Sequence, residues 1–472
     1  MLAAEVFASV AGFGVLIHLA RRLGPSGFAD FEYASAVGAW CLVLVRGGFD
    51  AIAQREAARR PVLIGPMTDL LIGLRLTSAA VGMAAVLALA WASGPGSGRG
   101  MVVAVAGLVL IPSALASDVG LRASGRFGAL ALAQVARSAG LAAGVWWLVG
   151  GPESAAVAAG CVAGAEVASS AVLLAFHGPI RPRFRRRAWA ALARRGAVAG
   201  ATRFGRVSLY AADVLALGWW AGPGLGPYAA ARRVAFALLA LGLVVPSAVA
   251  PRIARAWAEG SGEAREVIGR TIAGLMAAAL PATVGLMATA DRWMPRLFGD
   301  DFREGGPWLA LVAARLPFVL ASNVQQAALI ACRREVWAFW LVAAMAILGM
   351  ASIPPLAAIG GPWGVGMAAL GVESAGAVGG WFALRRLGLA PAWHHASGPA
   401  ALGSVGVAGA CWLGRGWPLG VVVVAGMGTY AAIGMAVGGR WRTPFPRAER
   451  NAGLPVGERQ DGLAVVPGGP AS

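Results

Sequence analysis

The stretch YAADVLALGWWAGPGLGPYAAARR (210–233) places one carboxylate and two guanidinium groups in an otherwise apolar setting. Most of its side chains suit lipid, yet Asp213 precedes a Gly/Pro-rich turn, and Arg232 and Arg233 follow that turn. A cluster of Gly and Pro between two apolar runs predicts a turn between helices. The stretch therefore predicts a hairpin of two membrane-crossing helices that carry ionisable groups inside the bilayer.

The composition of the whole chain agrees with a membrane setting. Of the 472 residues, 58% are hydrophobic and 13% are charged, and the mean hydropathy is +0.68. A soluble globular chain is about half apolar and about a quarter charged. Apolar runs long enough to cross a bilayer recur along the chain, and they are continuous rather than alternating, which argues against a β-barrel. We predict an all-α polytopic membrane protein.

About fourteen transmembrane helices are predicted in two six-helix lobes, followed by two C-terminal helices. The predicted spans lie near residues 2–20, 31–49, 70–92, 101–118, 128–149, 155–176, 197–219, 228–250, 271–290, 308–330, 337–357, 364–384, 399–414 and 418–438. The predicted divisions are an N-terminal lobe (1–176), a basic cytoplasmic loop (177–196), a C-terminal lobe (197–386), the two added helices (399–438) and a disordered cytoplasmic tail (439–472).

The distribution of arginine predicts the orientation of the chain. The net charge is +18, and every basic residue apart from the histidines is arginine. These arginines cluster in alternate loops, and basic loops stay in the cytoplasm. We therefore expect a multi-pass protein of the cytoplasmic (inner) membrane with both termini on the cytoplasmic side. Loop 177–196, with seven arginines and no acid, can bind anionic lipid headgroups. No nucleic-acid-binding motif accompanies the charge, so no nucleic-acid partner is expected.

The two lobes share a faint internal repeat. The first hairpin reads LGPSGFADFEYASA (23–36), and the hairpin between the seventh and eighth spans reads AGPGLGPYAAAR (221–232). Each contains Gly-Pro, further glycine, an aromatic residue and then small residues that enter the next helix. Both hairpins begin the second span of a lobe with the same orientation, which predicts a parallel pseudo-repeat, as in transporters built from two similar bundles.

Enzymatic and metal chemistry find no support in the sequence. The four cysteines, Cys41, Cys161, Cys332 and Cys411, lack metal-ligand spacing, and His394–His395 is an isolated doublet. No catalytic set of acids, bases and nucleophiles stands out on aqueous loops. We therefore expect neither an enzyme nor a bound metal or cofactor.

Ionisable residues inside spans are costly and mark functional sites or buried ion pairs. The candidates are Glu5, Glu32, Arg46, Arg75, Arg137, Glu166, Arg203, Arg206, Asp213, Arg232, Arg233, Arg315 and Glu373. Residues near span ends fit snorkelling, and the four-residue spacing of Arg46 and Asp50 predicts a local ion pair.

Deeper residues form polar stripes on the predicted helices. Arg203, Arg206, Tyr210 and Asp213 follow helical spacing in the seventh span. A second stripe in the tenth span begins at Arg315 and continues through Ser322, Asn323 and Gln326.

Together these stripes predict a hydrated, cationic cavity that suits an anionic substrate, because guanidinium groups bind phosphate oxygens in pairs. The expected substrate-binding cations are Arg137, Arg203, Arg206, Arg232, Arg233 and Arg315. The alternative is that each arginine only pairs with an acid. Asp213 and Glu166 are either structural partners of arginines or sites for a coupling ion.

Four segments, in order along the chain, resemble the polysaccharide-biosynthesis flippases, or lipid-linked oligosaccharide translocases, of the multidrug/oligosaccharidyl-lipid/polysaccharide exporter superfamily. The segments are ARRLGPSGFADFEYASAVGAW…GGFDAIAQREAARRP (20–61), the opening hairpin, LFGDDFREGGPWLALVAA (297–314) and GGPWGVGMAALGVESAGAV (360–378). The resemblance implies two six-helix lobes, alternating access, and a polyprenyl-pyrophosphate-linked glycan as cargo.

Further partners implied are membrane lipids and a polysaccharide polymerase or glycosyltransferases of the same pathway. An ion-coupled multidrug antiporter of the same superfamily is the alternative function, since fold does not fix function.

Overall fold

The computed structural model describes residues 2–94, 97–220, 224–391 and 393–436, and within these ranges it contains helices and no strand. The predicted tail (439–472) lies outside the described residues. The N-terminal half contains α1 (Leu2–Arg46), α2 (Phe49–Arg59), η1 (Pro61–Leu63), α3 (Ile64–Ala92), α4 (Gly98–Gly107), α5 (Leu110–Leu115), α6 (Asp118–Ala123), α7 (Phe127–Leu148), η2 (Pro152–Ser154) and α8 (Ala155–His177).

The C-terminal half continues with longer helices. They are α9 (Arg186–Trp220), α10 (Leu225–Glu259), α11 (Ser261–Phe298), η3 (Asp300–Phe302), α12 (Gly305–Ala313), α13 (Leu316–Ala331), α14 (Glu335–Arg386), α15 (Trp393–Leu413) and α16 (Leu419–Ala436).

The predicted all-α polytopic fold with about fourteen spans is confirmed. Helix α1 covers the first two spans, and α14 covers the eleventh and twelfth. Each is interrupted at a glycine with positive φ, Gly24 (φ 63°) and Gly361 (φ 52°), and a proline follows each glycine. Glycine adopts positive φ without a steric penalty, and proline removes a helical hydrogen bond, so the two residues together end one helical run and start another.

Eight helical stretches among the described residues are long and apolar enough to cross a membrane, and α14 alone has 52 residues. Helices α9 and α10 are not among the eight. These two helices carry Arg203, Arg206, Asp213, Arg232 and Arg233, which are most of the predicted site.

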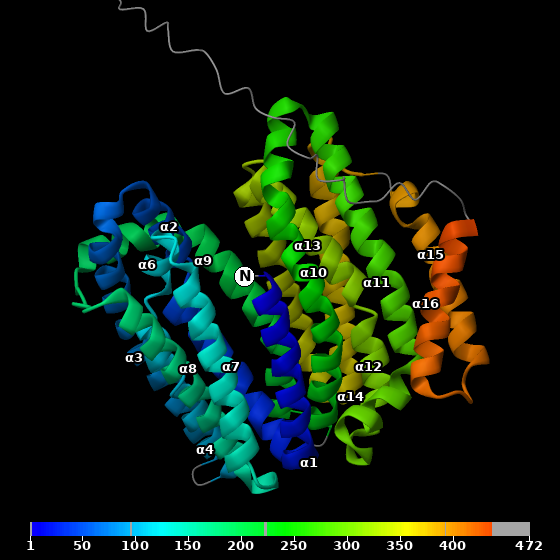
Figure 1. Ribbon diagram of the computed structural model, residues 1–472, viewed down its shortest axis with the longest axis horizontal. Helices are drawn as coiled ribbons and strands as arrows, with labels where there is room; N and C mark the ends of the chain where they lie inside the picture. Colours follow the sequence, from blue (N-terminus) through cyan, green and yellow to red (C-terminus); the bar gives the residue numbers. More distant parts are fainter. Residues whose placement is uncertain (1, 95–96, 221–223, 392, 437–472) are drawn as a thin grey trace, which may run out of the picture.

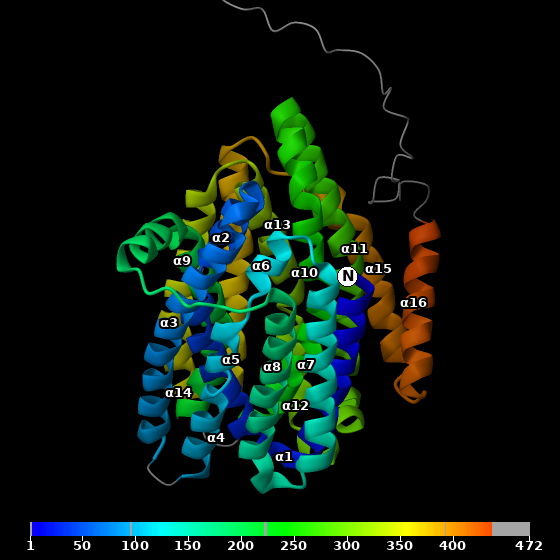
Figure 2. The same cartoon turned by 60° about the vertical axis from the view of Figure 1, so that its left-hand side comes forward.

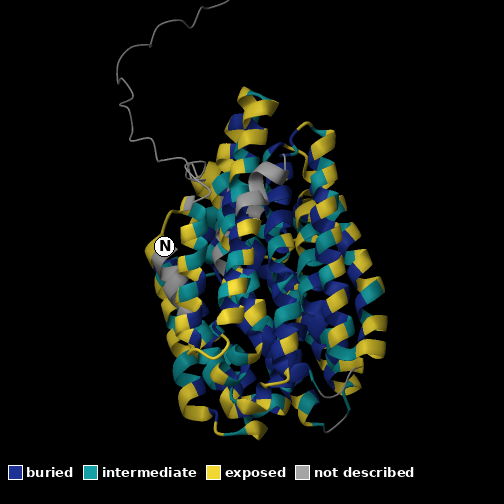
Figure 3. Cartoon of the chain, turned by 90° about the vertical axis from the view of Figure 1, so that its right-hand side faces the viewer, coloured by how far each residue is buried: buried dark blue, intermediate teal, exposed yellow. Residues whose placement is uncertain are grey.

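The helices form two groups that meet through α1 and α9. Helices α3, α4, α7 and α8 surround α1, whereas α10, α11, α13 and α14 pack together in the other group. Helix α9 contacts α14 along one side and α1 and α2 along the other, so it bridges the groups. Figure 1 shows the blue-to-teal and green-to-yellow groups side by side, with α15 and α16 added against α11 at the outer edge. Buried residues concentrate between the helices, and exposed residues lie on the outside (Figure 3). Many of the exposed residues are large and apolar, as expected for a chain surrounded by lipid.

The predicted basic loop differs from the structure in its second half. Residues 178–185 are non-helical, but Arg186 already begins α9, about three turns before the predicted start of the seventh span at residue 197. Figure 2 shows this coil crossing the upper end of α3 before α9 begins. The polar composition of this run predicts a loop. Arginine is nevertheless a good helix former, so the run continues as the first turns of α9.

The two hairpins of the predicted repeat lie against each other. Gly24 and Gly224 both have positive φ, and the backbone at Pro25 sits so close to Gly226 that any side chain there would clash. The Phe28 and Phe302 rings meet edge to face at 6.0 Å. We call this region, where residues 21–33 of α1 contact the C-terminal group, the joined end.

Candidate functional site

Asp213, from the opening stretch, is the centre of a buried cluster between α9, α10 and α13. The residue is 1% exposed. Its Oδ1 accepts a hydrogen bond from the backbone N–H of Val214 at 2.8 Å and lies 3.6 Å from Arg232 Nη1. Its Oδ2 accepts bonds from the Tyr228 hydroxyl at 3.3 Å and from Arg315 Nη1 at 3.4 Å. The structure thus brings two predicted arginines, Arg232 and Arg315, together around the predicted carboxylate of Asp213, and we call this set with Tyr228 the Asp213 cluster.

Arg315 and Arg232 differ in how fully their donors are used. Arg315 is 2% exposed, and its Nε has no hydrogen-bond partner among the described residues. Arg232 also donates to the Tyr210 carbonyl at 2.7 Å and lies over the Phe236 ring. Both arginines therefore have an acidic partner, which matches the alternative reading of the sequence in which arginines pair with acids.

Arg206 lies about two helical turns before Asp213 on α9, and it has no ion pair with an acid among the described residues. Its Nη2 donates to the Asn323 side-chain oxygen, and its guanidinium lies 5.5 Å from the centre of the Tyr210 ring. Its Nη1 is buried and has no partner in the part of the chain that is described. A half-used guanidinium between two helices can still donate hydrogen bonds to the oxygens of an anion.

Glu373 of α14 was among the intramembrane candidates but not among the predicted site residues. It is 0% exposed, and neither carboxylate oxygen has a hydrogen-bond partner among the described residues. The positive charges of Arg315 and Arg206 act on it electrostatically. Its position inside the motif at 360–378 was visible in the sequence, but no spacing rule linked it to α9 or α13.

Arg233 points away from this cluster and joins the two groups of helices. Its Nε donates to Glu32 Oε1 at 3.0 Å and Oε2 at 3.2 Å, and Glu32 is buried. Nearby, Arg99 bonds to Asp30 at 2.6 Å and to the Gly218 carbonyl at 2.8 Å. These contacts fasten the joined end, so Arg233 connects the groups rather than contributing to the Asp213 cluster.

Arg137 and Arg203 are exposed and have no ion pair with any described residue. Arg137 lies near the middle of α7, which packs mainly on α8 and α1 and has no extensive contact with the C-terminal group. The structure therefore places these two predicted cations outside the Asp213 cluster, with their charges unneutralised by the protein.

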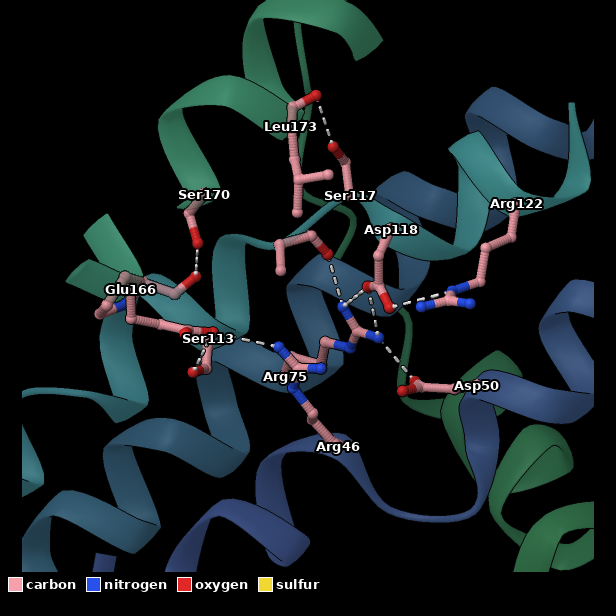
Figure 4. A network of polar contacts seen from close by, with 12 residues as sticks. Arg46, Asp50, Arg75, Ser113, Ser117, Asp118, Arg122, Glu166, Ser170 and Leu173 are labelled. Carbon is pink, nitrogen blue, oxygen red and sulfur yellow. Dashed lines mark hydrogen bonds and ion pairs between the residues drawn. The ribbon is translucent and has the colours of Figure 1, made fainter. Parts of the chain in front are cut away.

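The N-terminal group contains a second buried network that sequence reasoning treated only as scattered span ends. Arg75 of α3 is 1% exposed and pairs with Asp50 at 2.7 Å and Asp118 at 3.4 Å. It also donates to the Ala116 carbonyl at 2.6 Å. Figure 4 shows these groups converging from α2, α3 and the break between α5 and α6. We call this set the Arg75 cluster.

Glu166, the other predicted carboxylate, lies beside the Arg75 cluster. It accepts bonds from Arg46 Nη2 at 3.3 Å and from the Ser113 hydroxyl at 3.1 Å (Figure 4). The predicted local pair of Arg46 with Asp50 is wrong. Residues 47 and 48 break the helix between α1 and α2, so the four-residue spacing is not helical and Asp50 turns toward Arg75 instead.

An apolar cavity of about 600 Å³ lies at the other side of the C-terminal group. Helices α11, α15 and α16 form its walls, with Trp293, Val407 and Met427 among the lining side chains. Its size and apolar lining suit hydrocarbon rather than a charged group. In the described residues, no group of three or more His, Cys, Asp or Glu side chains is arranged to hold a metal ion.

The helical bundles, the buried charges and the apolar exterior define a multi-pass membrane protein of the transporter type. The chain matches the polysaccharide biosynthesis protein family over residues 18–307, which is more than half of its length. It belongs to that family. A search by sequence among curated proteins found no match.

Solved structures with the same fold are transporters. The lipid II flippase MurJ in an inward closed conformation aligns with a TM-score of 0.74 at 12% identity, over 92% of this chain and 98% of that one. An inward-facing multidrug resistance MATE family transporter of the MOP superfamily aligns with a TM-score of 0.60 at 15% identity, over 81% and 95%.

A MOP superfamily transporter from Pyrococcus furiosus aligns with a TM-score of 0.56 at 14% identity, over 82% of this chain and 95% of that one. At these identities the likeness concerns the fold. The predicted family and fold are therefore confirmed, and the cargo is a separate question.

Proposed function

We propose that this protein is a flippase that moves a polyprenyl-pyrophosphate-linked oligosaccharide across the cytoplasmic membrane for cell-surface polysaccharide synthesis. The observation that carries the proposal is a set of three arginines in a polysaccharide biosynthesis family member: Arg137 in the membrane-crossing helix α7, and Arg203 and Arg206 in the bridging helix α9. None of them has an acidic partner among the described residues. A cation held in a membrane helix needs a counter-charge, and a pyrophosphate supplies one.

The pyrophosphate is the proposed contact of these guanidinium groups. A planar guanidinium donates two parallel hydrogen bonds to neighbouring phosphate oxygens, which a drug-like cation cannot accept. The prenyl tail stays among lipid chains, and the apolar cavity between α11, α15 and α16 is wide enough to hold part of such a tail. The protein acts without a cofactor and without catalysis.

Transport proceeds in this proposal by alternating access. The joined end carries few of the basic loops, so the positive-inside rule makes it the outer side and makes both termini cytoplasmic. In this conformation Arg233, Arg99 and their partners hold the outer side together. The other end then receives cargo, and rocking of one group of helices against the other releases it outside.

Multidrug antiport is the second candidate, because MATE transporters share the fold. It predicts uptake of a cationic dye that depends on an ion gradient. The three unpaired arginines disfavour a cationic substrate, since like charges repel in a low-dielectric site.

Native mass spectrometry of the gently extracted protein tests the proposal. We expect a co-purified polyprenyl-pyrophosphate saccharide in the wild-type protein and less of it in Arg206→Ala and Arg137→Ala. Arg46→Ala is the matched control, since Arg46 is already paired with Glu166. Bulk phospholipid alone, with equal occupancy in all variants, would count against the flippase, and dye uptake would then favour antiport.

A further inference from the structure

The coil between α8 and α9 lies on α3 in a fixed position. Gly178, with φ 91°, turns the chain out of α8. The backbone N–H groups of Arg181 and Arg183 then donate to Asp69, to its Oδ1 and to its carbonyl oxygen, both at 3.0 Å. Arg183 Nε is also 3.5 Å from Asp69 Oδ2. We call residues 178–189 the strap.

Two further features seat the strap on the same turns of α3. The Arg183 backbone lies so close to Gly73 that no side chain fits between them. Trp189, in the first turn of α9, donates from its indole N–H to the Leu70 carbonyl at 3.3 Å. The Phe184 ring meets the Trp189 ring edge to face at 5.9 Å. The strap backbone is thus ordered by α3, and its remaining side chains point outward.

The outward side chains are mostly arginines that the protein leaves unpaired. Of the seven arginines in and just after the strap, Arg183 pairs with Asp69 and Arg195 pairs with Glu56. The other five side chains are exposed and have no acidic partner among the described residues. They are Arg181, Arg185, Arg186, Arg187 and Arg194. The sequence contains no Asp or Glu between Glu166 and Asp213.

The position of the strap relative to the membrane determines which anions it can contact. Asp69 to Gly73 are the second and third turns of α3, and the membrane-crossing stretch that includes α3 begins at Pro61. The strap therefore lies at the level where the span enters the membrane. Phe184 is 65% exposed beside the arginines. Aromatic and basic side chains together are typical of the headgroup region.

We infer that the strap is a binding site for anionic phospholipid headgroups in the leaflet that meets this end of α3. The five arginines supply the charge, Phe184 and Trp189 supply contact with the acyl-chain boundary, and Asp69 and Gly73 hold the backbone in place. Ordering before binding lowers the entropy lost on binding, so the site retains lipid more firmly than a flexible run of the same charge.

The test measures lipid preference without any cargo. Full-length protein is placed in bilayers of equal parts phosphatidylglycerol and phosphatidylcholine, extracted gently, and analysed by native mass spectrometry. The strap variant carries Arg185→Gln, Arg186→Gln and Arg187→Gln. The matched control carries Arg252→Gln, Arg255→Gln and Arg265→Gln, three exposed arginines without an acidic partner among the described residues, at the α10–α11 end.

Each basic residue near an anionic surface contributes about a five-fold preference, so the strap variant should lose about a hundredfold of its preference for phosphatidylglycerol. The control should change by less than about five-fold. Asp69→Asn keeps every arginine but weakens the anchor, and we expect a partial loss of about five-fold.

Equal losses in the strap and control variants would overturn the inference, because they would reflect net charge alone. So would an unchanged preference in the strap variant, as expected if the strap binds an acidic protein instead. Thermal unfolding checks that all variants are folded. Since no cargo is present, this result is independent of the proposed flippase activity.

Discussion

Each group of helices buries one arginine almost completely, but the two arginines are neutralised differently. Arg75 has two carboxylates and a carbonyl oxygen as partners, and it shares one of the carboxylates, Asp118, with Arg122. Arg315 has a single carboxylate, Asp213, which it shares with Arg232, Tyr228 and a backbone N–H. Arg75 thus has more acceptors than Arg315, although each guanidinium keeps a buried Nε without a hydrogen-bond partner among the described residues.

The charge balance shows the same contrast. With their neighbours, the N-terminal residues are three arginines and three acids, namely Arg46, Arg75, Arg122, Asp50, Asp118 and Glu166. The C-terminal residues are three arginines and two acids, namely Arg206, Arg232, Arg315, Asp213 and Glu373. The first set is neutral, and each of its acids has an arginine partner, which suits a brace. The second set carries one excess positive charge and donors without partners among the described residues. Such a region would be stabilised by binding an anion.

The largest expected difference is between Arg75→Gln and Arg315→Gln. Glutamine at 75 leaves Asp50 and Asp118, whose side chains are 20% and 15% exposed, without their main cation, and breaking a buried pair costs up to about 3–5 kcal/mol. Glutamine at 315 leaves Asp213 with Arg232, Tyr228 and the Val214 N–H, so we expect about 1–3 kcal/mol. Unfolding in detergent, followed by circular dichroism, measures both.

Equal destabilisation by the two substitutions would break the comparison. It would mean that Arg232 does not neutralise Asp213 alone, and that the C-terminal cluster braces its group of helices as firmly as the Arg75 cluster does.

The next effect concerns transport rather than stability. Arg206→Ala removes a guanidinium whose Nη1 has no partner in the described structure, and a hydrogen bond to a charged group contributes about 1.5–3 kcal/mol. We expect glycan export to fall about 10- to 100-fold while stability changes by less than about 1 kcal/mol. Arg46→Ala, in the paired N-terminal set, should leave export within about three-fold of wild type. Normal export by the Arg206 variant would argue against the cationic cavity.

The contrast between the clusters also shows what the sequence could predict. Continuous apolar runs indicated the helices, and the helical spacing of Arg203, Arg206 and Asp213 indicated a polar face, because both patterns are local. The partners of Arg75 and Glu32 come from residues 25 to about 200 positions away, so no spacing rule reaches them. The glycine breaks at residues 47–48 and 361 redirect the chain by backbone conformation, which local charge patterns do not report.

Replacing each of two acids by its neutral isostere should change stability by a smaller amount, and the two changes should differ in sign. Glu166→Gln weakens the bonds to Arg46 and Ser113, so we expect a loss of about 1 kcal/mol. Glu373→Gln removes a buried charge that has no hydrogen-bond partner among the described residues, and it relieves the cost of burying that charge. We expect Glu373→Gln to leave the midpoint of thermal unfolding unchanged or to raise it. A lowered midpoint would mean that Glu373 is paired in the folded protein.

The smallest expected effect tests whether burial or the number of ion pairs determines how much an arginine near Asp118 contributes to stability. Arg122 lies 3.8 Å from Asp118, its side chain is 44% exposed, and the two residues are one helical turn apart. Exposed pairs of this kind contribute about 0.3–0.5 kcal/mol and are screened by salt. Arg122→Ala should therefore lower stability by no more than that amount, and the difference from wild type should vanish in high salt. Arg75→Gln should keep most of its effect at high salt, because the Arg75 side chain is 1% exposed and its partners are only 15–20% exposed. If Arg122→Ala were as damaging as Arg75→Gln, the strength of the N-terminal brace would come from the net charge around Asp118 rather than from the one buried guanidinium.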